Sequence, residues 1–360
     1  MFFYMPAKVY LEENCVLNHA KELCSLGSKA LIVTGRRSAA ANGSLDDVLS
    51  ALSAGNVASV IFNEVEENPS VETIMKARDL GVAEKTDFVI GIGGGSAMDA
   101  AKAIAMMIRH ADAGWEYLYD GSQPSDTLPI VEVPTTSGTG SEATAVSILT
   151  RKDTMTKGSI PHKFFSTLSL CDGKYLKSAP YSVLANTTMD ALAHLLESAV
   201  NSDATDYSRM CAFAGLEVWK RSKEVLEKKL EPSMQDYENM MSASMLAGMA
   251  IAHTGTSLPH GMSYAVTVHA GMPHGKACGF FLPAYMKEAD QELAADLLSR
   301  AGFTDADDLE RYYQATCGRD IVSEDVLLKA VGDLLTHPEK QKKAPFHVDE
   351  KVLRRMAGLD

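Results

Sequence analysis

Residues 87–105, DFVIGIGGGSAMDAAKAIA, decide the fold of the first half of this chain. An apolar run leads into four glycines between positions 91 and 95, and a helix-forming stretch begins at Ser96. Glycines let the backbone approach a ligand closely, and a helix start offers free N–H groups and a positive dipole end to a pyrophosphate. The stretch predicts a strand, a phosphate-binding turn and a helix. The alternative is an ordinary tight turn that binds nothing.

A second loop of similar composition, PTTSGTGSEAT at residues 134–144, also follows an apolar run. Two loops rich in glycine and hydroxyl groups, each at the end of a strand, favour a dinucleotide ligand. Neither loop has the Gly-Lys-Ser/Thr sequence of a P-loop. The pattern therefore argues against ATP chemistry.

The wider pattern predicts two domains. In the first half, four β-branched runs alternate with amphipathic stretches, an order that is typical of a parallel sheet covered by helices. We predict strands at residues 30–34, 58–62, 87–92 and 129–133, and helices at 71–82 and 97–109. From Pro180 helical patterns dominate, at 189–200, 206–230, 236–253, 283–301 and 323–335. The expected fold class is an α/β dinucleotide-binding domain (1–179) and an all-α metal-binding domain (180–360), joined by a linker at 173–180.

Composition narrows the class of protein. The 360 residues are 46% hydrophobic and 22% charged, as in a globular protein, and the net charge of -13 argues against nucleic acid as a partner. The six cysteines form no CxxC pair, which favours a reducing, cytoplasmic location. No apolar stretch is long enough for a membrane span. We expect no membrane partner, while the alanine-rich helical half allows a homo-oligomer.

The end of the first predicted strand bears on the choice of cofactor. There the chain reads Thr34, Gly35, Arg36, Arg37, without the acid that would bind a ribose 2′-hydroxyl. A small residue beside arginine leaves room and positive charge for a 2′-phosphate. Gly35 and Arg36 therefore predict NADP(H) in preference to NAD(H). The alternative is that both arginines are solvated loop residues.

Four residues in the second half have the chemistry of a metal site. Asp190 and His194 are four residues apart in the segment 186–200, which begins with capping candidates and continues as a helix, so both side chains lie on one helical face. His260 and His274 stand in glycine-marked contexts, LPHGM and MPHG. One carboxylate and three imidazoles suit Fe²⁺, with Zn²⁺ as the alternative. Each histidine alone has the simpler interpretation of a packed or capping residue.

Taken together, these motifs resemble the iron-containing, or group III, alcohol dehydrogenases over nearly the whole chain. GIGGGSAMDAAK, PTTSGTGSEAT, MDALAHLLE, LPHGM and MPHG occur in the order and approximate spacing of that family. The resemblance implies a metal-dependent oxidoreductase that moves a hydride between NAD(P)(H) and a primary alcohol or aldehyde. It implies Asp190, His194, His260 and His274 as metal ligands. The cofactor contacts that it implies are Asn68, Gly94, Gly95, Ser96, Asp99, Thr135, Thr136, Ser137, Val146 and Lys157.

The chain departs from the family at one position. Many members have another histidine four residues after the third ligand, where this sequence has Tyr264. That histidine is often credited with proton transfer or substrate placement. The proton donor here is therefore open between water, a cofactor ribose hydroxyl, Tyr264 and His253. Tyr264 has a second interpretation as an aromatic wall of the substrate pocket.

Two other functions compete with this one. A polyol (glycerol-type) or glycerol-phosphate dehydrogenase, or a dehydroquinate-synthase-like enzyme, would pair NAD with a metal as well. Sites for phosphate or carboxylate substrates need extra cations, and residues 250–280 contain only Lys276. A non-catalytic nucleotide sensor is the alternative outside enzymology, and the four potential metal ligands argue against it.

Overall fold

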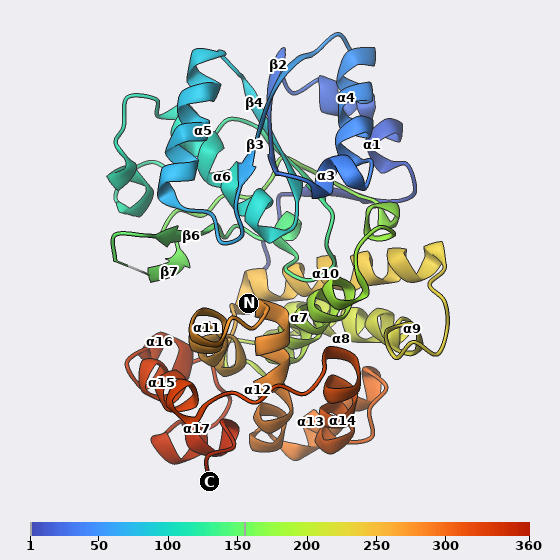
Figure 1. The fold of residues 1–360 in the computed structure, drawn as a ribbon, viewed down its shortest axis with the longest axis vertical. Coiled ribbons are helices and arrows are strands. Elements are labelled where there is room, and N and C mark those ends of the chain that lie inside the picture. Colours follow the sequence, from blue (N-terminus) through green and yellow to red (C-terminus); the bar gives the residue numbers. More distant parts are fainter. Residues whose placement is uncertain (1, 155) are drawn as a thin grey trace. The chain divides into compact units, whose positions relative to one another are not determined.

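The computed structural model describes residues 2–154 and 156–360, which divide into two compact units (Figure 1). The sheet unit contains Met5–Thr136 and Ser141–Ala179. The helical unit contains Ser137–Gly140, Pro180–Asp360 and the N-terminal segment that ends at Tyr4. The chain therefore passes between the units at several places, whereas the sequence predicts one passage near residue 179.

A parallel six-stranded sheet forms the centre of the sheet unit, in the order β1-β8-β5-β4-β2-β3. The four strands predicted from the sequence are present as β2, β3, β4 and β5. The prediction missed β1 and β8, which are only four residues long, and the antiparallel hairpin of β6 and β7. The strands are β1 (Lys8–Leu11), β2 (Lys29–Gly35), β3 (Ala58–Val65), β4 (Phe88–Gly93), β5 (Ile130–Pro134), β6 (Ile148–Arg151), β7 (Thr156–Ser159) and β8 (Leu168–Cys171).

Helices cover both faces of the sheet, with α5 and α6 on one face and α1 and α4 on the other (Figure 1). Alternate residues of a strand point to opposite faces. Leu31 accordingly packs with α5 and α6, and Ile32 packs with α1, α2 and α4. These helices are α1 (Cys15–Asn18), α2 (Ala20–Cys24), α3 (Ser38–Ala41), α4 (Ser44–Ala54), α5 (Val71–Ala83) and α6 (Gly95–Arg109).

The predicted linker at 173–180 is wrong in its first half. Residues Gly173–Leu176 form a short 3-10 helix, capped by the Asp172 carboxylate, which accepts from the Lys174 N–H at 2.9 Å. Tyr175 is buried in the core between the sheet and α1. Burial of a large aromatic side chain is favourable and holds this segment against the core, so the segment is not a flexible linker.

The helical unit is built around α7, which is buried continuously from Thr188 to Val200 and packs against α8, α10, α12 and α14. A helix buried on every side has no solvent-facing stripe, so any polar side chain that it carries must find its partners inside the protein. The helices of this unit are α7 (Tyr181–Val200), α8 (Asp206–Lys220), α9 (Lys223–Leu226), α10 (Met234–Thr254), α11 (Leu258–Ala270), α12 (His274–Glu288), α13 (Gln291–Arg300), α14 (Ala306–Cys317), α15 (Glu324–Leu335), α16 (Pro338–Gln341) and α17 (Glu350–Met356).

Three predicted helix bounds are wrong. The helix predicted over 189–200, with capping residues before it, begins at Tyr181, so Asn186 and Thr187 are interior residues rather than caps. The helix predicted over 206–230 is divided into α8 and α9. The helix predicted over 283–301 is divided because Asp290 caps α13, accepting from the Leu293 N–H at 3.0 Å.

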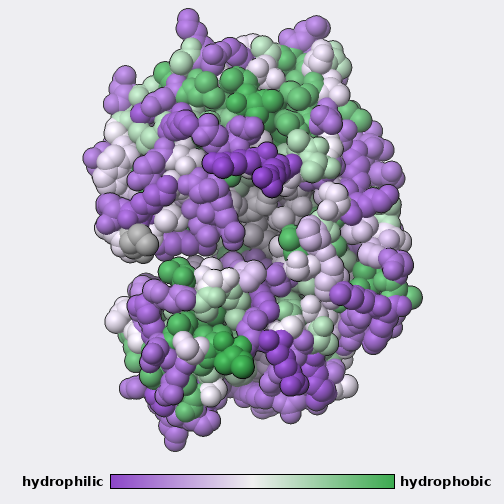
Figure 2. Space-filling model, viewed as in Figure 1, coloured by the Kyte–Doolittle hydropathy of each residue, from purple (hydrophilic) through white to green (hydrophobic). Residues whose placement is uncertain are grey.

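The surface is mainly polar on the side that Figure 2 draws, where hydrophilic side chains surround smaller hydrophobic areas. None of the helices formed by the described residues is long and apolar enough to cross a lipid bilayer.

Candidate metal and cofactor sites

One face of α7 carries three groups with acid or base chemistry. Asp190, His194 and Glu197 are spaced by four and then three residues, which places their side chains along one side of the helix. All three are buried, with 3%, 5% and 0% of their surfaces exposed. Buried charged groups need partners, so this face indicates a site rather than ordinary packing.

The other two predicted ligands stand at the starts of two helices. His260 lies in the first turn of α11, after Pro259, and His274 is the first residue of α12. Gly275 allows α12 to reach α7, because a Cβ there would lie 2.1 Å from the Asn186 carbonyl oxygen and 2.7 Å from Asp190 Cβ. The glycine of the MPHG motif thus brings His274 beside Asp190.

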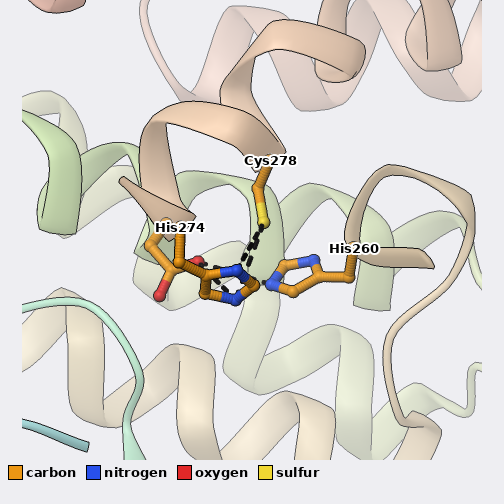
Figure 3. Close-up of side chains that lie close together, drawn as sticks. His260, His274 and Cys278 are labelled. Atoms are coloured by element: carbon orange, nitrogen blue, oxygen red, sulfur yellow. Dashed lines mark hydrogen bonds and ion pairs between the residues drawn. The ribbon is translucent and has the colours of Figure 1, made fainter. Parts of the chain in front are cut away.

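The structure brings Asp190, His260 and His274 together with Cys278. Their four ligand atoms all lie within 4.8 Å of one another. Asp190 Oδ1 is 3.4 Å from His260 Nε2 and 3.9 Å from His274 Nε2. Figure 3 shows Cys278 Sγ directed toward the rings of His260 and His274.

Two atoms of this cluster fit a bound cation. Asp190 Oδ1 and His260 Nε2 are buried and face each other at 3.4 Å, and neither makes a hydrogen bond of ordinary geometry with any residue that the structure describes. Buried polar atoms are rarely left without a partner. A carboxylate oxygen and imidazole nitrogens are suitable donors for Fe²⁺ or Zn²⁺. The residues present therefore fit a divalent metal ion.

His194 adjoins this cluster but points differently. Its ring stacks on that of His260, with centroids 4.2 Å apart. Its Nδ1 donates to the Gly138 carbonyl oxygen at 3.2 Å, which leaves the Nε2 lone pair available for a metal. Burial lowers the pKa of His194 to about 4, so the ring is neutral near pH 7. Neutral imidazole is the form that binds metal ions.

The charge of Asp190 is stabilised by its neighbours. Burial opposes ionisation of the carboxyl, but His194, His260 and His274 outweigh that effect and lower its pKa below the ordinary range. The Asp190 carboxylate is therefore anionic across the physiological pH range.

Sequence reasoning missed Glu197 and Cys278. The Glu197 carboxylate makes a short hydrogen bond with His260 Nδ1 and accepts from the Ser257 N–H at 2.6 Å. Such a partner fixes the orientation and tautomer of a ligand histidine. The signal was spacing, since Glu197 lies seven residues after Asp190 and Cys278 four residues after His274.

The two predicted proton donors lie in different surroundings. Both ring nitrogens of His253 have partners, because Nε2 accepts from the Tyr4 N–H at 3.1 Å and Nδ1 donates to the Met249 carbonyl at 2.7 Å. Phe3 also stacks on this ring. Tyr264 lies one turn after His260 and stacks on His274, with centroids 6.1 Å apart.

In the sheet unit, the predicted phosphate loop joins β4 to α6. Gly93 has φ of 153°, a conformation that side chains disfavour, and Gly94 is the N-cap of α6. A Cβ at Gly94 would lie 3.0 Å from Thr136 Oγ1, so the two glycine-rich loops approach each other here. Backbone N–H groups at such a helix start suit a phosphate.

Two further predicted contacts, Asn68 and Lys157, lie next to this loop. The Asn68 N–H donates to Ser96 Oγ at 3.2 Å, and Lys157 Nζ donates to Asn68 Oδ1 at 2.6 Å. Asn68 adopts a left-handed conformation with φ of 57°. The hairpin residue Lys157 is thus joined to the helix start through Asn68.

Asp99 has protein partners. Its carboxylate accepts from Ser141 Oγ at 2.6 Å and from the Ile148 N–H at 2.9 Å. Lys102, which the sequence analysis missed, donates to the Ser141 and Val146 carbonyls at 2.7 and 3.1 Å. These contacts fasten the segment that contains Val146 to α6.

The predicted 2′-phosphate region lies at the end of β2. Gly35 is the last residue of that strand, and Arg36 and Arg37 are exposed. A Cβ at Gly35 would lie 3.6 Å from the Val65 carbonyl oxygen, an ordinary contact, so the backbone itself does not require glycine there.

Comparisons with known proteins cover most of the chain. The iron-containing alcohol dehydrogenase profile matches residues 6–173, and the profile of the C-terminal part of that family matches residues 184–317. The NADPH-dependent butanol dehydrogenase of Clostridium saccharobutylicum is 31% identical over 80% of this chain and 74% of its own. The 1,3-propanediol dehydrogenase of Klebsiella pneumoniae is 30% identical over 84% and 80%.

Solved structures agree with these sequence matches. An iron-containing alcohol dehydrogenase from Thermotoga maritima is 35% identical and superposes with a TM-score of 0.90, over 99% of this chain and 98% of its own. Sulfoacetaldehyde reductase from Bifidobacterium kashiwanohense, solved with NAD⁺, is 25% identical with a TM-score of 0.88, over 99% and 97%. The predicted fold class is confirmed. The chain is an NAD(P)-dependent oxidoreductase that belongs to the iron-containing alcohol dehydrogenase family.

Proposed function

We propose that this enzyme transfers a hydride between NADP(H) and a primary alcohol or aldehyde whose oxygen is held at the metal site. The observation that carries the proposal is the buried cluster in which Asp190 Oδ1 and His260 Nε2 lack hydrogen-bond partners among the described residues. An ion at that place would satisfy both atoms.

The metal would be held by Asp190, His194, His260 and His274. Fe²⁺ is the expected ion and Zn²⁺ the alternative. A bound divalent ion acts as a Lewis acid on the substrate oxygen. Glu197 orients His260, and the Gly138 carbonyl orients His194, so that both imidazoles present Nε2.

The dinucleotide would be held through its pyrophosphate by the backbone around Gly94, Gly95 and Ser96. The other proposed contacts are Asn68, Asp99, Thr135, Thr136, Ser137, Val146 and Lys157. The carboxylate of Asp99 supports the loop rather than the cofactor directly, because Ser141 and Ile148 occupy it. Gly35 and Arg36 would select the 2′-phosphate of NADP(H). One relative is named as NADPH-dependent, and another was solved with NAD⁺.

For the final proton we retain Tyr264, whose hydroxyl oxygen would pass a proton to the product alkoxide. Its ring lies parallel to His274, at 7° between the planes. His253 is the weaker candidate, because Tyr4 and Met249 already engage both of its nitrogens. Two relatives act, by their names, on butanol and 1,3-propanediol. A third relative, from Geobacillus thermodenitrificans, is named as a long-chain-alcohol dehydrogenase, so the names agree on an alcohol and not on its chain length.

We further propose a cytoplasmic location and a homo-oligomeric assembly.

The test is a panel of short aldehydes with NADH and NADPH, after anaerobic loading with Fe²⁺ or Zn²⁺. Metal-dependent oxidation of the reduced cofactor is expected with at least one aldehyde. Full turnover by the chelated, metal-free enzyme would contradict the proposed function. Exchange of the two cofactors in the same panel tests the NADP(H) assignment separately.

A further inference from the structure

We propose that the segment Ser137–Gly140, here called the strap, couples dinucleotide binding to metal binding. The middle of the strap holds His194 through the Gly138 carbonyl, and both of its ends are fastened to elements of the phosphate loop. A dinucleotide at that loop should therefore raise the affinity for the metal ion, and a bound ion should raise the affinity for the dinucleotide. This coupling rests on the proposed function and adds a link between its two binding sites.

The middle of the strap packs against α7, the helix that carries Asp190 and His194. A Cβ at Gly138 would lie 2.7 Å from the Thr187 carbonyl oxygen, so glycine is needed for this close approach. The Gly138 carbonyl accepts from His194 Nδ1 at 3.2 Å. A partner of this kind fixes the tautomer and ring orientation of a ligand histidine, and its loss typically costs about 10–100-fold in metal affinity. The strap thus presents His194 Nε2 to an ion.

The last residue of the strap packs against α10. Gly140 has φ of 59°, and a Cβ there would lie 2.5 Å from the Ser244 carbonyl oxygen. From the side of the helix, a Cβ at Gly248 would overlap the Gly140 carbonyl oxygen. A side chain at either glycine would therefore push the strap away from α10. Gly248 is not among the proposed ligands of the metal or the dinucleotide, so its substitution displaces the strap without removing a ligand.

The residues on either side of the strap are fastened to β4 and α6. Before the strap, the Thr135 N–H donates to the Gly93 carbonyl at 2.8 Å. After it, Ser141 Oγ donates to the Asp99 carboxylate at 2.6 Å, and the Ser141 carbonyl accepts from Lys102 Nζ at 2.7 Å. Gly93 ends β4, and Asp99 and Lys102 lie on α6, whose first turn would hold the pyrophosphate. A ligand that orders this turn therefore restrains both ends of the strap.

The sign of the coupling follows from conformational entropy. Two of the four strap residues are glycines, which lose more backbone freedom than other residues when they are held in one conformation. That loss opposes the hydrogen bond between Gly138 and His194. When a dinucleotide has already restrained the ends of the strap, less of this entropy remains to be lost as the ion binds. Linkage makes the effect reciprocal, and couplings of this kind typically change affinities by about 5–150-fold.

The experiment measures the affinity of the metal-free, full-length enzyme for Zn²⁺ by competition with a chromophoric chelator, with and without ADP-ribose or its 2′-phosphorylated form. These fragments contain the pyrophosphate but no nicotinamide, so contact between nicotinamide and the ion cannot explain a change. Binding of Zn²⁺ by the fragments themselves is measured without protein and subtracted. We expect the dissociation constant for Zn²⁺ to fall by about fivefold or more when the fragment is bound. Hydrogen exchange of the strap amides should slow with either ligand alone.

Two helical glycines provide a test variant and its matched control. Gly248→Ala displaces the strap, so it should weaken Zn²⁺ binding by about tenfold and remove most of the coupling. Its affinity for the fragment without Zn²⁺ should stay within about threefold of wild type, because the phosphate loop is unchanged. Gly332→Ala is the control, because a Cβ at this position in α15 would meet nothing within 4 Å. This variant should keep both affinities and the full coupling.

The possible outcomes separate the coupling from the proposed function. If wild type binds Zn²⁺ and the fragment and neither changes the affinity for the other, the coupling is overturned and the proposed function stands. If wild type fails to bind either ligand, the proposed function itself is overturned. Full coupling in Gly248→Ala would show that the strap is not the link. If Gly248→Ala does not fold, wild type still decides, because coupling without slower hydrogen exchange in residues 137–140 excludes the strap.

Discussion

The metal site and the phosphate loop are built in different ways. The predicted metal ligands come from α7, α11 and α12, and Asp190 and His274 are far apart in the sequence, so only the packing of helices brings them together. The predicted phosphate loop is one continuous turn from Gly93 to Ser96, which would offer mainly backbone N–H groups to a ligand. Single side-chain substitutions should therefore damage the metal site severely and the phosphate loop only slightly.

The largest effect expected is on the metal site. His274→Ala, or His260→Ala, removes an imidazole donor from the buried cluster and should lower kcat by about a thousandfold or more, given that a metal ion contributes several kcal/mol of charge stabilisation. Metal content of the purified variant and steady-state kinetics check this. Dinucleotide affinity, measured by fluorescence titration of the metal-free proteins, should change less than threefold or so, because no contact in the phosphate loop is altered. Full metal occupancy with normal rates would refute the ligand assignment.

The second effect concerns a buried acid below the phosphate loop. Glu142 is 1% exposed, and its carboxylate oxygens have no hydrogen-bond partner among the described residues. Burial raises its pKa to about 7, and the backbone N–H of Glu142 and the charge of Lys102 oppose this only in part. The folded protein thus binds this proton more tightly than the unfolded chain, so the resulting stability is complete below about pH 4.3 and is lost as the pH rises to about 7.

Glu142→Gln removes this pH dependence. The free energy of unfolding of wild type relative to the variant should therefore fall by a few kcal/mol between pH 4.5 and pH 7.5. Urea unfolding at several pH values measures the difference, with the exposed Glu72→Gln on α5 as the control. Parallel pH profiles for wild type and Glu142→Gln would show that the acid ionises freely in the folded protein.

A smaller effect, on the free energy of unfolding, should distinguish alanine substitutions at two helical glycines. A Cβ at Gly275 would lie 2.1 Å from the Asn186 carbonyl oxygen, whereas a Cβ at Gly332, in α15, would meet nothing within 4 Å. Gly275→Ala should lower the free energy of unfolding by about 1–3 kcal/mol through overpacking and weaken metal binding. Gly332→Ala should raise stability by roughly 0.5–1 kcal/mol, as alanine favours helices. Thermal unfolding with and without metal compares them, and equal Tm values would contradict the close contact.

The same contrast explains what could be predicted from the sequence. Buried parallel strands and glycine-rich turns are local patterns, so β2, β3, β4, β5 and the start of α6 followed from the residues themselves. The short strands β1 and β8 have four residues each, too few for a hydrophobic period to show. Their pairing is a long-range property, since β1 lies beside β8.

The sequence could not predict which side chains of different helices contact each other in the site. Asp190, His260 and His274 were predicted by motif, and they lie together in the structure. Glu197 and Cys278 were missed, because a helical spacing of four or seven residues has meaning only when the facing helix is known. The hydrogen bond from the Tyr4 N–H to His253 could not be predicted either, because these residues are 249 positions apart.

The smallest expected effect tests the end of β2, where the cofactor interpretation depends on Gly35 and Arg36. A guanidinium that meets a 2′-phosphate makes charge-assisted hydrogen bonds worth roughly 1.5–3 kcal/mol each, which is about tenfold or more in affinity. Because Arg36 is exposed, solvent screens its charge, and the preference for NADPH over NADH should lie near the tenfold end of this range. We expect kcat/KM to be about tenfold higher with NADPH than with NADH, and Gly35→Asp to reverse the order, since a carboxylate repels the phosphate and binds the 2′-hydroxyl. The Cβ of that variant fits, at 3.6 Å from the Val65 carbonyl oxygen. Arg36→Ala should lower kcat/KM with NADPH and leave kcat/KM with NADH unchanged. A wild-type preference for NADH would show that both arginines are solvated surface residues that do not contact the cofactor.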